Sequence, residues 1–243
     1  MKKGLYYGIL AILIAVFLFS AYQIGDYMLE KYRSDQMINS VSKFVTVEHG
    51  ASTEEEPAGD PERIEVDFDE LRKVNSDIVG WIYCANTRFN YPIVQGTDNE
   101  YYLHHLLDGT WNNNGTLFMD YRNSADFSDR NTMIHGHHMK SGAMFGELIQ
   151  YKKQSFYDEH PYIYIMTEGQ NYRLDLLAGC VVDSSSDIYT TELSDEMIYN
   201  CMANSTFAPK VSYQGGRVVS LSTCSYEYDD ARYVVLGELV SIE

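Results

Sequence analysis

The sequence predicts a mainly β domain, either a barrel or a sandwich. Its C-terminal three quarters hold many short runs of β-branched and aromatic residues, separated by turns rich in Asn, Asp and Gly. Long helical patterns are few there, which favours a barrel or sandwich over a doubly wound sheet. From Ile64 to the end the chain has about 180 residues, a length that suits a single domain with one sizeable core.

The N-terminal segment is long and apolar enough to cross a membrane. Residues 4–25 carry no charge, and a helix of that length reaches about 33 Å, against roughly 30 Å for a bilayer core. Lys2 and Lys3 precede this run and Asp26 follows it. The positive-inside rule therefore predicts a single-pass protein of the cell membrane with residues 1–3 in the cytoplasm. A cleaved signal peptide is the alternative, although the run is long for one and no clear cleavage site closes it. Both interpretations make the folded domain extracytoplasmic.

Residues 26–63 are expected to form a stalk and an acidic linker. Apolar residues at a loose helical spacing up to Val47 predict a helix that continues the membrane segment or packs on the domain. Residues 48–62 contain three consecutive glutamates, two prolines and two glycines. This composition is too polar and too interrupted to bury a core, so we expect a flexible linker. The folded domain then comprises residues 64–243.

The domain is expected to open with a short helix and to continue in strands. Asp67 and Glu70 resemble a capping box, in which Asp67 accepts from the backbone and Glu70 reaches back, for a helix through Val74. Strands are predicted at Val79–Cys84, Phe89–Gln95, Gly115–Met119, Asn131–His135, Tyr162–Met166, Tyr172–Val182, Val211, Arg217–Thr223 and Arg232–Val240. Helical patterns occur at Asn99–Leu107, Met144–Tyr151 and Leu193–Met202.

A thiol, a cation and a histidine stand out as candidate catalytic groups. Cys224 lies at a predicted strand end, Arg232 follows eight positions later, and His137 lies upstream in the run 134–139. A free thiol has a pKa near ~8.5, and a nearby His⁺ or Arg raises the thiolate fraction. Acyl transfer also needs an acid for the departing amine and a donor for the oxyanion, which a histidine and an arginine can supply. The three residues predict a thiol transferase or a cysteine protease.

These residues resemble those of the sortases, Gram-positive membrane enzymes that attach proteins to the cell wall by transpeptidation. The segment Leu221-Ser222-Thr223-Cys224 is similar to their Thr-Leu-x-Thr-Cys signature, with Ser220 in place of the leading Thr. Class B is the most similar class. The stretch 131–139 with 144–146 resembles its histidine motif, although His135 stands where that motif has tyrosine. The stretch 91–96 resembles its early strand, and the resemblance runs from about Phe68 to the end of the chain.

The resemblance implies a fold and an activity. The expected fold is a sortase-type closed β-barrel with short N-terminal helices and an added helix before the last strands. Cys224 would attack a Thr carbonyl in a C-terminal sorting signal of the Pro-x-Thr type and form a thioacyl-enzyme, with His137 as acid then base and Arg232 holding the substrate carbonyl. An amine of peptidoglycan or of its lipid-linked precursor would then resolve the intermediate. No cofactor is implied.

The resemblance also implies a substrate groove. Position in the motif assigns six residues to its lining: Asn99, Leu103, Ser222, Thr223, Ile188 and Tyr189. The last two lie in the connection that would form one wall. A solvated surface loop is an equal alternative for that connection, because Ser184 to Ser186 precede them.

The remaining cysteines and histidines have simpler interpretations. Cys84, Cys180 and Cys201 are expected to be buried small side chains, with at most one disulfide among them. His135, His137 and His138, with His104 and His105, are close enough in sequence to suggest metal ligands, but no zinc-binding spacing supports a metal. The formal net charge of −17 disfavours nucleic acid as a partner.

Two rival functions are compatible with the same residues. A pilus-polymerising sortase would share the three catalytic residues but would usually show a C-terminal membrane helix and an aromatic lid motif. A catalytically silent surface binding module would use the same barrel for adhesion, and its cysteine would be unreactive. A papain-like protease fits less well, since its cysteine precedes its histidine.

Overall fold

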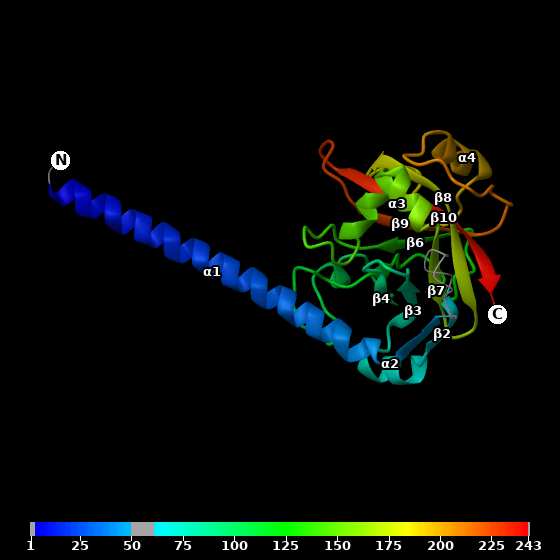
Figure 1. The fold of residues 1–243 in the computed structure, drawn as a ribbon, viewed down its shortest axis with the longest axis horizontal. Helices are drawn as coiled ribbons and strands as arrows, with labels where there is room; N and C mark the ends of the chain where they lie inside the picture. Colours follow the sequence, from blue (N-terminus) through cyan, green and yellow to red (C-terminus); the bar gives the residue numbers. More distant parts are fainter. Residues whose placement is uncertain (1–2, 50–60, 243) are drawn as a thin grey trace.

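The computed structural model describes residues 3–49 and 61–242, and a closed β-barrel forms the body of the molecule (Figure 1). The strand order around the barrel is β10-β8-β7-β3-β4-β5-β6-β9. Their bounds are β3 Ile78–Tyr83, β4 Asn90–Val94, β5 Phe118–Met119, β6 Asn131–His135, β7 Tyr162–Met166, β8 Asn171–Asp183, β9 Val218–Cys224 and β10 Ala231–Ile242. Most pairs are antiparallel, and β4–β5 and β6–β9 are parallel. The strand pattern left a barrel and a sandwich open, and the structure confirms the closed barrel that the resemblance implied.

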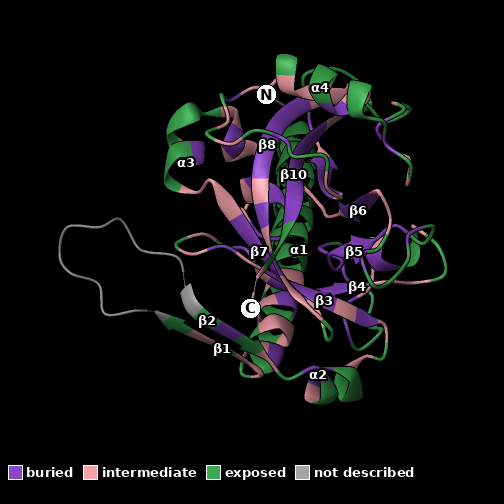
Figure 2. Ribbon diagram, turned by 90° about the vertical axis from the view of Figure 1, so that its right-hand side faces the viewer, coloured by how far each residue is buried: buried purple, intermediate pink, exposed green. Residues whose placement is uncertain are grey.

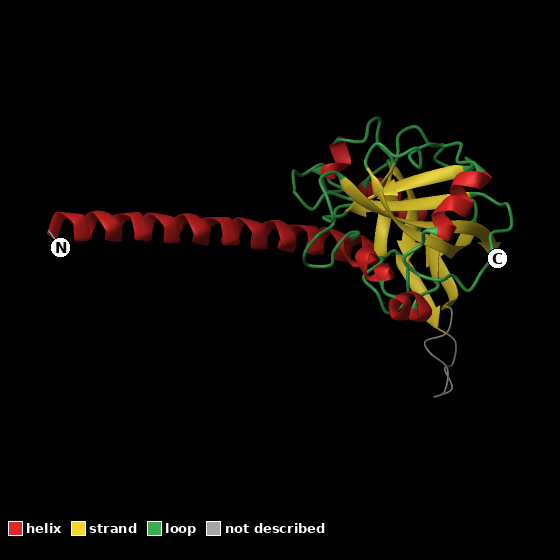
Figure 3. Cartoon of the chain, turned by 90° about the horizontal axis from the view of Figure 1, so that it is seen from above, coloured by secondary structure: helices red, strands yellow, loops and turns green. Residues whose placement is uncertain are grey.

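The helices lie outside the barrel, and one of them projects far from it (Figure 3). Their bounds are α1 Lys3–Ser42, α2 Phe68–Val74, α3 Gln154–Glu159 and α4 Asp195–Ala203, with 3₁₀ helices η1 Tyr101–Leu103 and η2 Gly146–Lys152. Helix α4 is the added helix expected before the last strands. Helix α1 is the one helix of the described residues that is long and apolar enough to cross a membrane.

The core fills the barrel and extends beneath α4 (Figure 2). Strand β8 shows why. Its first residues alternate between buried and partly exposed, as expected for a strand with one solvated face. From Leu176 to Cys180 every residue is buried, because Ile198 of α4 and its neighbours cover the outer face.

A two-stranded ribbon connects α1 to the barrel. Strand β1 Val45–His49 pairs antiparallel with β2 Pro61–Val66. The ribbon packs with the end of α1 on the barrel, where Val41 is fully buried and Val45 contacts the same cluster. The flanks of the predicted linker are therefore ordered strands, since their apolar residues find a partner surface. Residues 50–60, the middle of that linker, lie outside the described residues.

Helix α2 forms as its cap predicts, with one difference. The Asp67 carboxylate accepts the N–H of Glu70 at 3.0 Å. Glu70 does not reach back to the backbone of Asp67, because its carboxylate pairs with Lys73 instead. The N–H of Asp67 donates to the carbonyl of Phe44, so the ribbon satisfies this donor.

Four predicted elements were wrong in extent or kind. The strand expected at Gly115–Met119 is reduced to the two residues of β5. The helix expected at Asn99–Leu107 is reduced to η1, because the backbone of His104 accepts from Asn112 and bends the chain into a loop. The helical pattern at Met144–Tyr151 forms the 3₁₀ helix η2. Val211 lies in a loop rather than a strand, and the Glu238 carboxylate holds the end of that loop through backbone N–H groups of Gln214 and Gly216.

Candidate functional site

The candidate catalytic residues meet at one end of the barrel, where three neighbouring strands begin or end. Strand β6 runs parallel to β9, with His135 opposite Ser222. Strand β10 runs antiparallel to β9, with Arg232 directly opposite Cys224. His137 follows β6 by two residues, so the ends of β6 and β9 and the start of β10 bring the histidine, the thiol and the guanidinium to the same rim.

Backbone contacts fix the segment that carries His137 against the end of β9. The N–H of Gly136 donates to the carbonyl of Ser222 at 3.1 Å, and the Thr223 hydroxyl donates to the carbonyl of Gly136 at 2.8 Å. One residue further on, Nδ1 of His138 donates to the carbonyl of Cys224 at 3.0 Å. Gly136 is needed here, because a Cβ would lie 2.3 Å from a Leu117 methyl group. His137 therefore sits between two residues that are tied to the strand of Cys224.

The surroundings of His137 favour its neutral imidazole form. Its Nε2 lies 2.7 Å from the carbonyl oxygen of Leu103, so this nitrogen carries the proton and Nδ1 has the free lone pair. Burial lowers the pKa of His137, and the nearby His104 adds to that effect, while the bond to Leu103 opposes it. A ring with one free lone pair can accept a proton from a neighbouring acid.

The lowered pKa of His137 predicts a pH dependence of stability. The unfolded chain binds a proton at this residue more readily than the folded one, so the free energy of unfolding falls with acidification through the ordinary pKa of about 6.5. We expect His137→Gln to become more stable relative to the wild type between about pH 7.5 and about pH 5.5. Urea unfolding at both pH values measures this, and His160, whose pKa is also lowered, is present in both proteins and cancels. Parallel pH dependences in the two proteins would contradict it.

Cys224 differs from the other three cysteines in its surroundings. All four are free thiols, and Cys224 is partly exposed at the barrel rim. Cys84 is buried, and this burial raises its pKa to about 12. Cys180 lies in β8 beneath α4 and Cys201 lies in α4 itself, and the Cys180 thiol donates to the carbonyl of Cys201 at 3.3 Å. Of the four, Cys224 alone is accessible beside a cation.

Arg232 makes a hydrogen bond to the backbone and, among the described residues, no ion pair. Its Nη1 donates to the carbonyl of Ala231 at 3.1 Å. Within residues 3–49 and 61–242 no carboxylate forms a salt bridge with it, although Asp229 and Asp230 are close in sequence. Burial raises the pKa of the Tyr189 phenol, and the Ser222 bond and the Arg232 charge oppose part of this rise. The Asp183 carboxylate, whose pKa is lowered mainly by its bonds to Ser185, also interacts with the Arg232 charge, although the two form no salt bridge. The guanidinium remains available to the oxygen of a ligand.

The residues assigned to the groove fall into two groups. The hydroxyl groups of Tyr189 and Ser222 form a hydrogen bond of 2.8 Å, which links the 184–190 connection to β9. A hollow of about 630 Å³ begins at Tyr189 and continues along this connection. Ile188 and Thr223 are both 2% exposed, and Ser222 is 3% exposed. These three residues are buried behind the wall and do not line the hollow, whereas Tyr189 does.

Asn99 is held in place by a buried carboxylate. Its amide nitrogen donates to Asp120 at 2.9 Å, and its amide oxygen accepts the N–H of Tyr121 at 3.0 Å. Arg122 makes three further bonds to Asp120, two from its guanidinium and one from its backbone N–H, and Nε2 of His135 lies 3.5 Å from the same carboxylate. Burial would raise the pKa of Asp120, but these bonds hold it well below its usual range.

Removing this carboxylate should destabilise the domain. Asp120→Ala leaves the Arg122 and Asn99 donors without their acceptor, and we expect a loss of about 1–3 kcal/mol in the free energy of unfolding, discounted because Arg122 is half exposed. The exposed Asp187 is the matched control, for which Asp187→Ala should change stability by less than about 0.5 kcal/mol. The pKa of Asp120 is lower in the folded than in the unfolded chain. Its contribution to the free energy of unfolding is therefore fully present above about pH 3.9 and declines as the pH falls further. Equal stability of the two variants in urea unfolding would contradict the assignment.

The rings of His104 and Trp111 lie beside His137. The sequence did not indicate that they belong to the site. The His104 ring lies 5.9 Å from the His137 ring, and it stacks on Trp111 at 4.9 Å. Nδ1 of His104 is buried without a hydrogen-bond partner.

Within the described part of the chain, no group of three or more His, Cys, Asp or Glu side chains is placed to hold a metal ion. A pocket of about 840 Å³ lies by the β1–β2 ribbon, and none of the candidate residues lines it.

Comparisons with known proteins agree with one another. The sortase domain family model matches residues 82–240. Sortase B of Listeria monocytogenes is 33% identical over 241 residues, which cover 95% of this chain and 94% of that protein. Sortase B of Staphylococcus aureus is 30% identical over 189 residues, 74% of this chain and 78% of that protein.

Solved structures show the same likeness. The S. aureus sortase B–substrate complex superposes with a TM-score of 0.68 at 30% identity, covering 72% of this chain and 85% of that one. Sortase B from B. anthracis in complex with AAEK2 superposes with a TM-score of 0.72 at 30% identity, covering 90% of this chain and 99% of that one.

Proposed function

Because the chain belongs to the sortase family and its relatives are sortases of class B, we propose that it is a membrane-anchored cysteine transpeptidase that cleaves a C-terminal sorting signal of the Pro-x-Thr type after Thr. The observation that carries this proposal is the pairing of Cys224 with Arg232 across β9 and β10, with His137 tied to the same rim. A thiol, an unpaired guanidinium and a neutral imidazole are the groups that an acyl transfer uses.

In the first half of the reaction the sulfur of Cys224 attacks the Thr carbonyl carbon. The thiol proton passes to the free nitrogen of His137, and the negative charge that develops on the carbonyl oxygen faces Arg232. The tetrahedral intermediate then collapses, the peptide bond breaks, and His137 gives the same proton to the departing amine. The products are a thioacyl-enzyme and a shortened signal peptide.

In the second half an amine of peptidoglycan or of its lipid-linked precursor attacks the thioester. His137, neutral again, takes a proton from the attacking amine, the carbon–sulfur bond breaks, and the proton returns to the Cys224 sulfur. The new amide joins the surface protein to the cell wall. The burial of His137, which lowers its pKa, supports this role. An imidazole that is neutral at the start of each step can accept a proton in both of them.

The groove residues supply recognition in this proposal. Tyr189 lines the hollow along 184–190, which offers room for an extended peptide, and the buried Ser222 holds the Tyr189 hydroxyl in place. Leu103 anchors His137 through its carbonyl, and Asn99, fixed by Asp120, shapes the opposite side. The sortase B of S. aureus, a solved relative, forms a complex with substrate, which supports a substrate-binding role for this chain.

The proposed location follows from α1. Its apolar side chains from Leu5 to Met28 are exposed, and no protein covers them in the candidate span. Exposed apolar surface of this extent is costly in water. We place residues 4–25 in the bilayer, residues 1–3 in the cytoplasm, and the domain from residue 64 outside.

The experiment that tests the proposed function is a coupling assay. The chain is incubated with a panel of peptides that carry Pro-x-Thr motifs, with and without a peptide that has a free N-terminal glycine, and products are read by mass spectrometry. Transpeptidation predicts a joined product only in the presence of the amine, and its sequence identifies the motif. A folded protein that cleaves no peptide in the panel would favour the surface binding module.

A further inference from the structure

The loop of residues 104–115 is attached to α1 just beyond the end of its apolar segment. The amide of Asn112 donates to the backbone carbonyl of Glu30 at 2.8 Å, and the amide of Asn113 donates to the Glu30 carboxylate at 2.8 Å. Asn112 is completely buried, so the first of these bonds is shielded from water. The loop is therefore fixed to the helix at the level of Glu30.

That level lies close to the surface of a bilayer. The charge-free run ends at Gly25, and Glu30 follows five residues later, which is about 7.5 Å along an α-helix. The headgroup region on each side of a bilayer is roughly 5–8 Å thick, given a core of about 30 Å within a total of about 40–45 Å. If residues 4–25 span the membrane, the loop reaches the outer edge of the headgroups.

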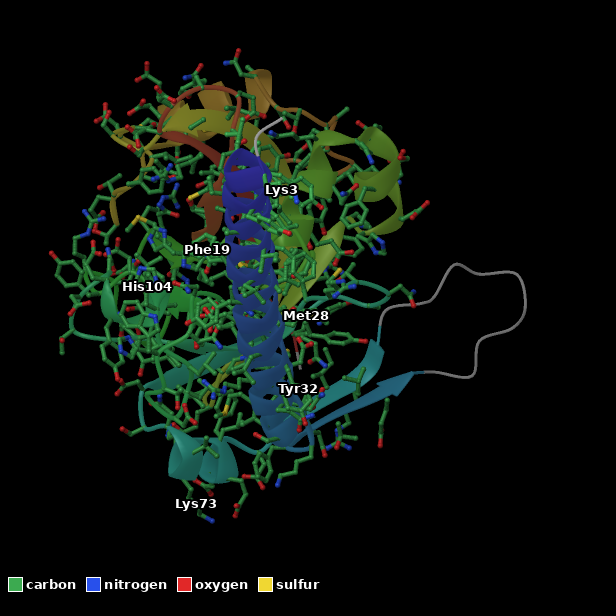
Figure 4. The ribbon with its side chains drawn as sticks, turned by 90° about the vertical axis from the view of Figure 1, so that its left-hand side faces the viewer. Lys3, Phe19, Met28, Tyr32, Lys73 and His104 are labelled. Atoms are coloured by element: carbon green, nitrogen blue, oxygen red, sulfur yellow. The ribbon has the colours of Figure 1, made fainter. Side chains whose placement is uncertain are left out.

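The loop presents an aromatic side chain of the type that prefers this depth. Trp111 is 58% exposed, although it stacks on His104 and meets His105 edge-on. Tyr22 and Tyr27 of α1 are exposed at the same end of the apolar run. Trp and Tyr concentrate at membrane–water interfaces, where the ring is in contact with lipid and its polar group with water. Figure 4 looks along α1 from the N-terminal side, and His104 lies on the face of the domain beside the helix.

We propose that the loop of residues 104–115 docks on the lipid headgroups through Trp111, so that the candidate active site opens at the membrane surface. The proposal rests on the anchoring role of α1 that belongs to the proposed function. Trp111 stacks on His104, and His104 adjoins His137. Docking would thus place the catalytic histidine a few side chains from the bilayer, where an amine on a lipid-linked acceptor is available. The net charge of −17 argues that aromatic contact, and not attraction to anionic lipid, holds the loop there.

Tryptophan fluorescence tests this docking, because the chain has two tryptophans and the other one is sequestered. Trp81 is fully buried in the core, with its indole N–H bonded to Asn90. The full chain is reconstituted in phosphatidylcholine vesicles whose acyl chains are brominated near the glycerol end, and flotation measures the fraction of protein that is anchored. We expect the vesicles to quench the part of the emission that comes from Trp111. The Trp111→Phe variant, which keeps an aromatic ring on His104, should float equally well and show no quenching.

The remaining outcomes each count against the proposal in a distinguishable way. A chain that floats but whose emission is not quenched overturns the docking and leaves the anchor intact. A chain that does not float shows that α1 does not anchor it, and the docking proposal then fails with its premise. The coupling assay on soluble peptides still tests the transpeptidase activity in that case. An unquenched emission that changes with protein concentration would instead assign Trp111 to contact with a second copy of the chain.

Discussion

Replacement of Cys224 by alanine is expected to abolish cleavage of the sorting peptide, with a loss of roughly 10³-fold or more in kcat/KM. The reason is that alanine has no atom that can attack the Thr carbonyl, so the residual rate comes only from substrate positioning and the remaining groups. Cleavage of a quenched fluorescent peptide measures this loss. Cys224 lies at the rim of the barrel and is partly exposed, so the substitution should leave the fold unchanged, which circular dichroism can verify.

Cys201 provides the matched control for this substitution. It is also partly exposed, but it lies in α4 beside Cys180 and far along the chain from His137. Cys201→Ala should therefore retain peptide cleavage near the wild-type rate. A Cys224→Ala protein that cleaves as fast as Cys201→Ala would show that Cys224 is not the nucleophile and would favour the binding module.

Replacement of Arg232 by alanine is expected to lower kcat by about 10²- to 10³-fold with a smaller change in KM, because the guanidinium acts mainly on charge that develops in the transition state. Arg232→Lys keeps the charge but loses the planar donor pair, so its rate should lie between those of the alanine variant and the wild type. Steady-state kinetics on the peptide identified by the coupling assay separates kcat from KM.

Arg63 is the control for a general effect of removing a cation. It lies in the β1–β2 ribbon, is exposed, and pairs with Glu65. Arg63→Ala should leave both kinetic constants unchanged. If Arg232→Ala instead raised KM with kcat intact, the residue would contribute uniform binding and not stabilisation of the oxyanion.

The strands around the site could be predicted because their signal is local. The runs that became β6, β7, β9 and β10 consist of β-branched, aromatic and aliphatic residues bounded by turns. The Asp67 cap of α2 is equally local, since its acceptor and donor are three residues apart. The proximity of Cys224 and Arg232 follows from an antiparallel turn between two adjacent strands, which the eight-residue spacing suits.

The parts that were missed depend on contacts between distant residues. The helix expected at Asn99–Leu107 is cut short by bonds from Asn112 and Thr116, and Asn112 is itself held by Glu30, 82 residues earlier. The strands at the edges of the linker form only because the end of α1 and the barrel offer an apolar surface. Asp120 gave no signal as the residue that fixes Asn99, because the two residues are 21 positions apart and meet only in the folded chain.

If Cys224 carries the substrate as a thioester, intact-mass spectrometry of the protein after brief incubation with the cleaved peptide will detect that intermediate. We expect an adduct with the mass of the peptide up to Thr, located on Cys224 by fragmentation, absent in Cys224→Ala and cleared faster when an amine is added. Cleavage that proceeds without any adduct, or an adduct that maps to Cys84, Cys180 or Cys201, would contradict the proposed mechanism.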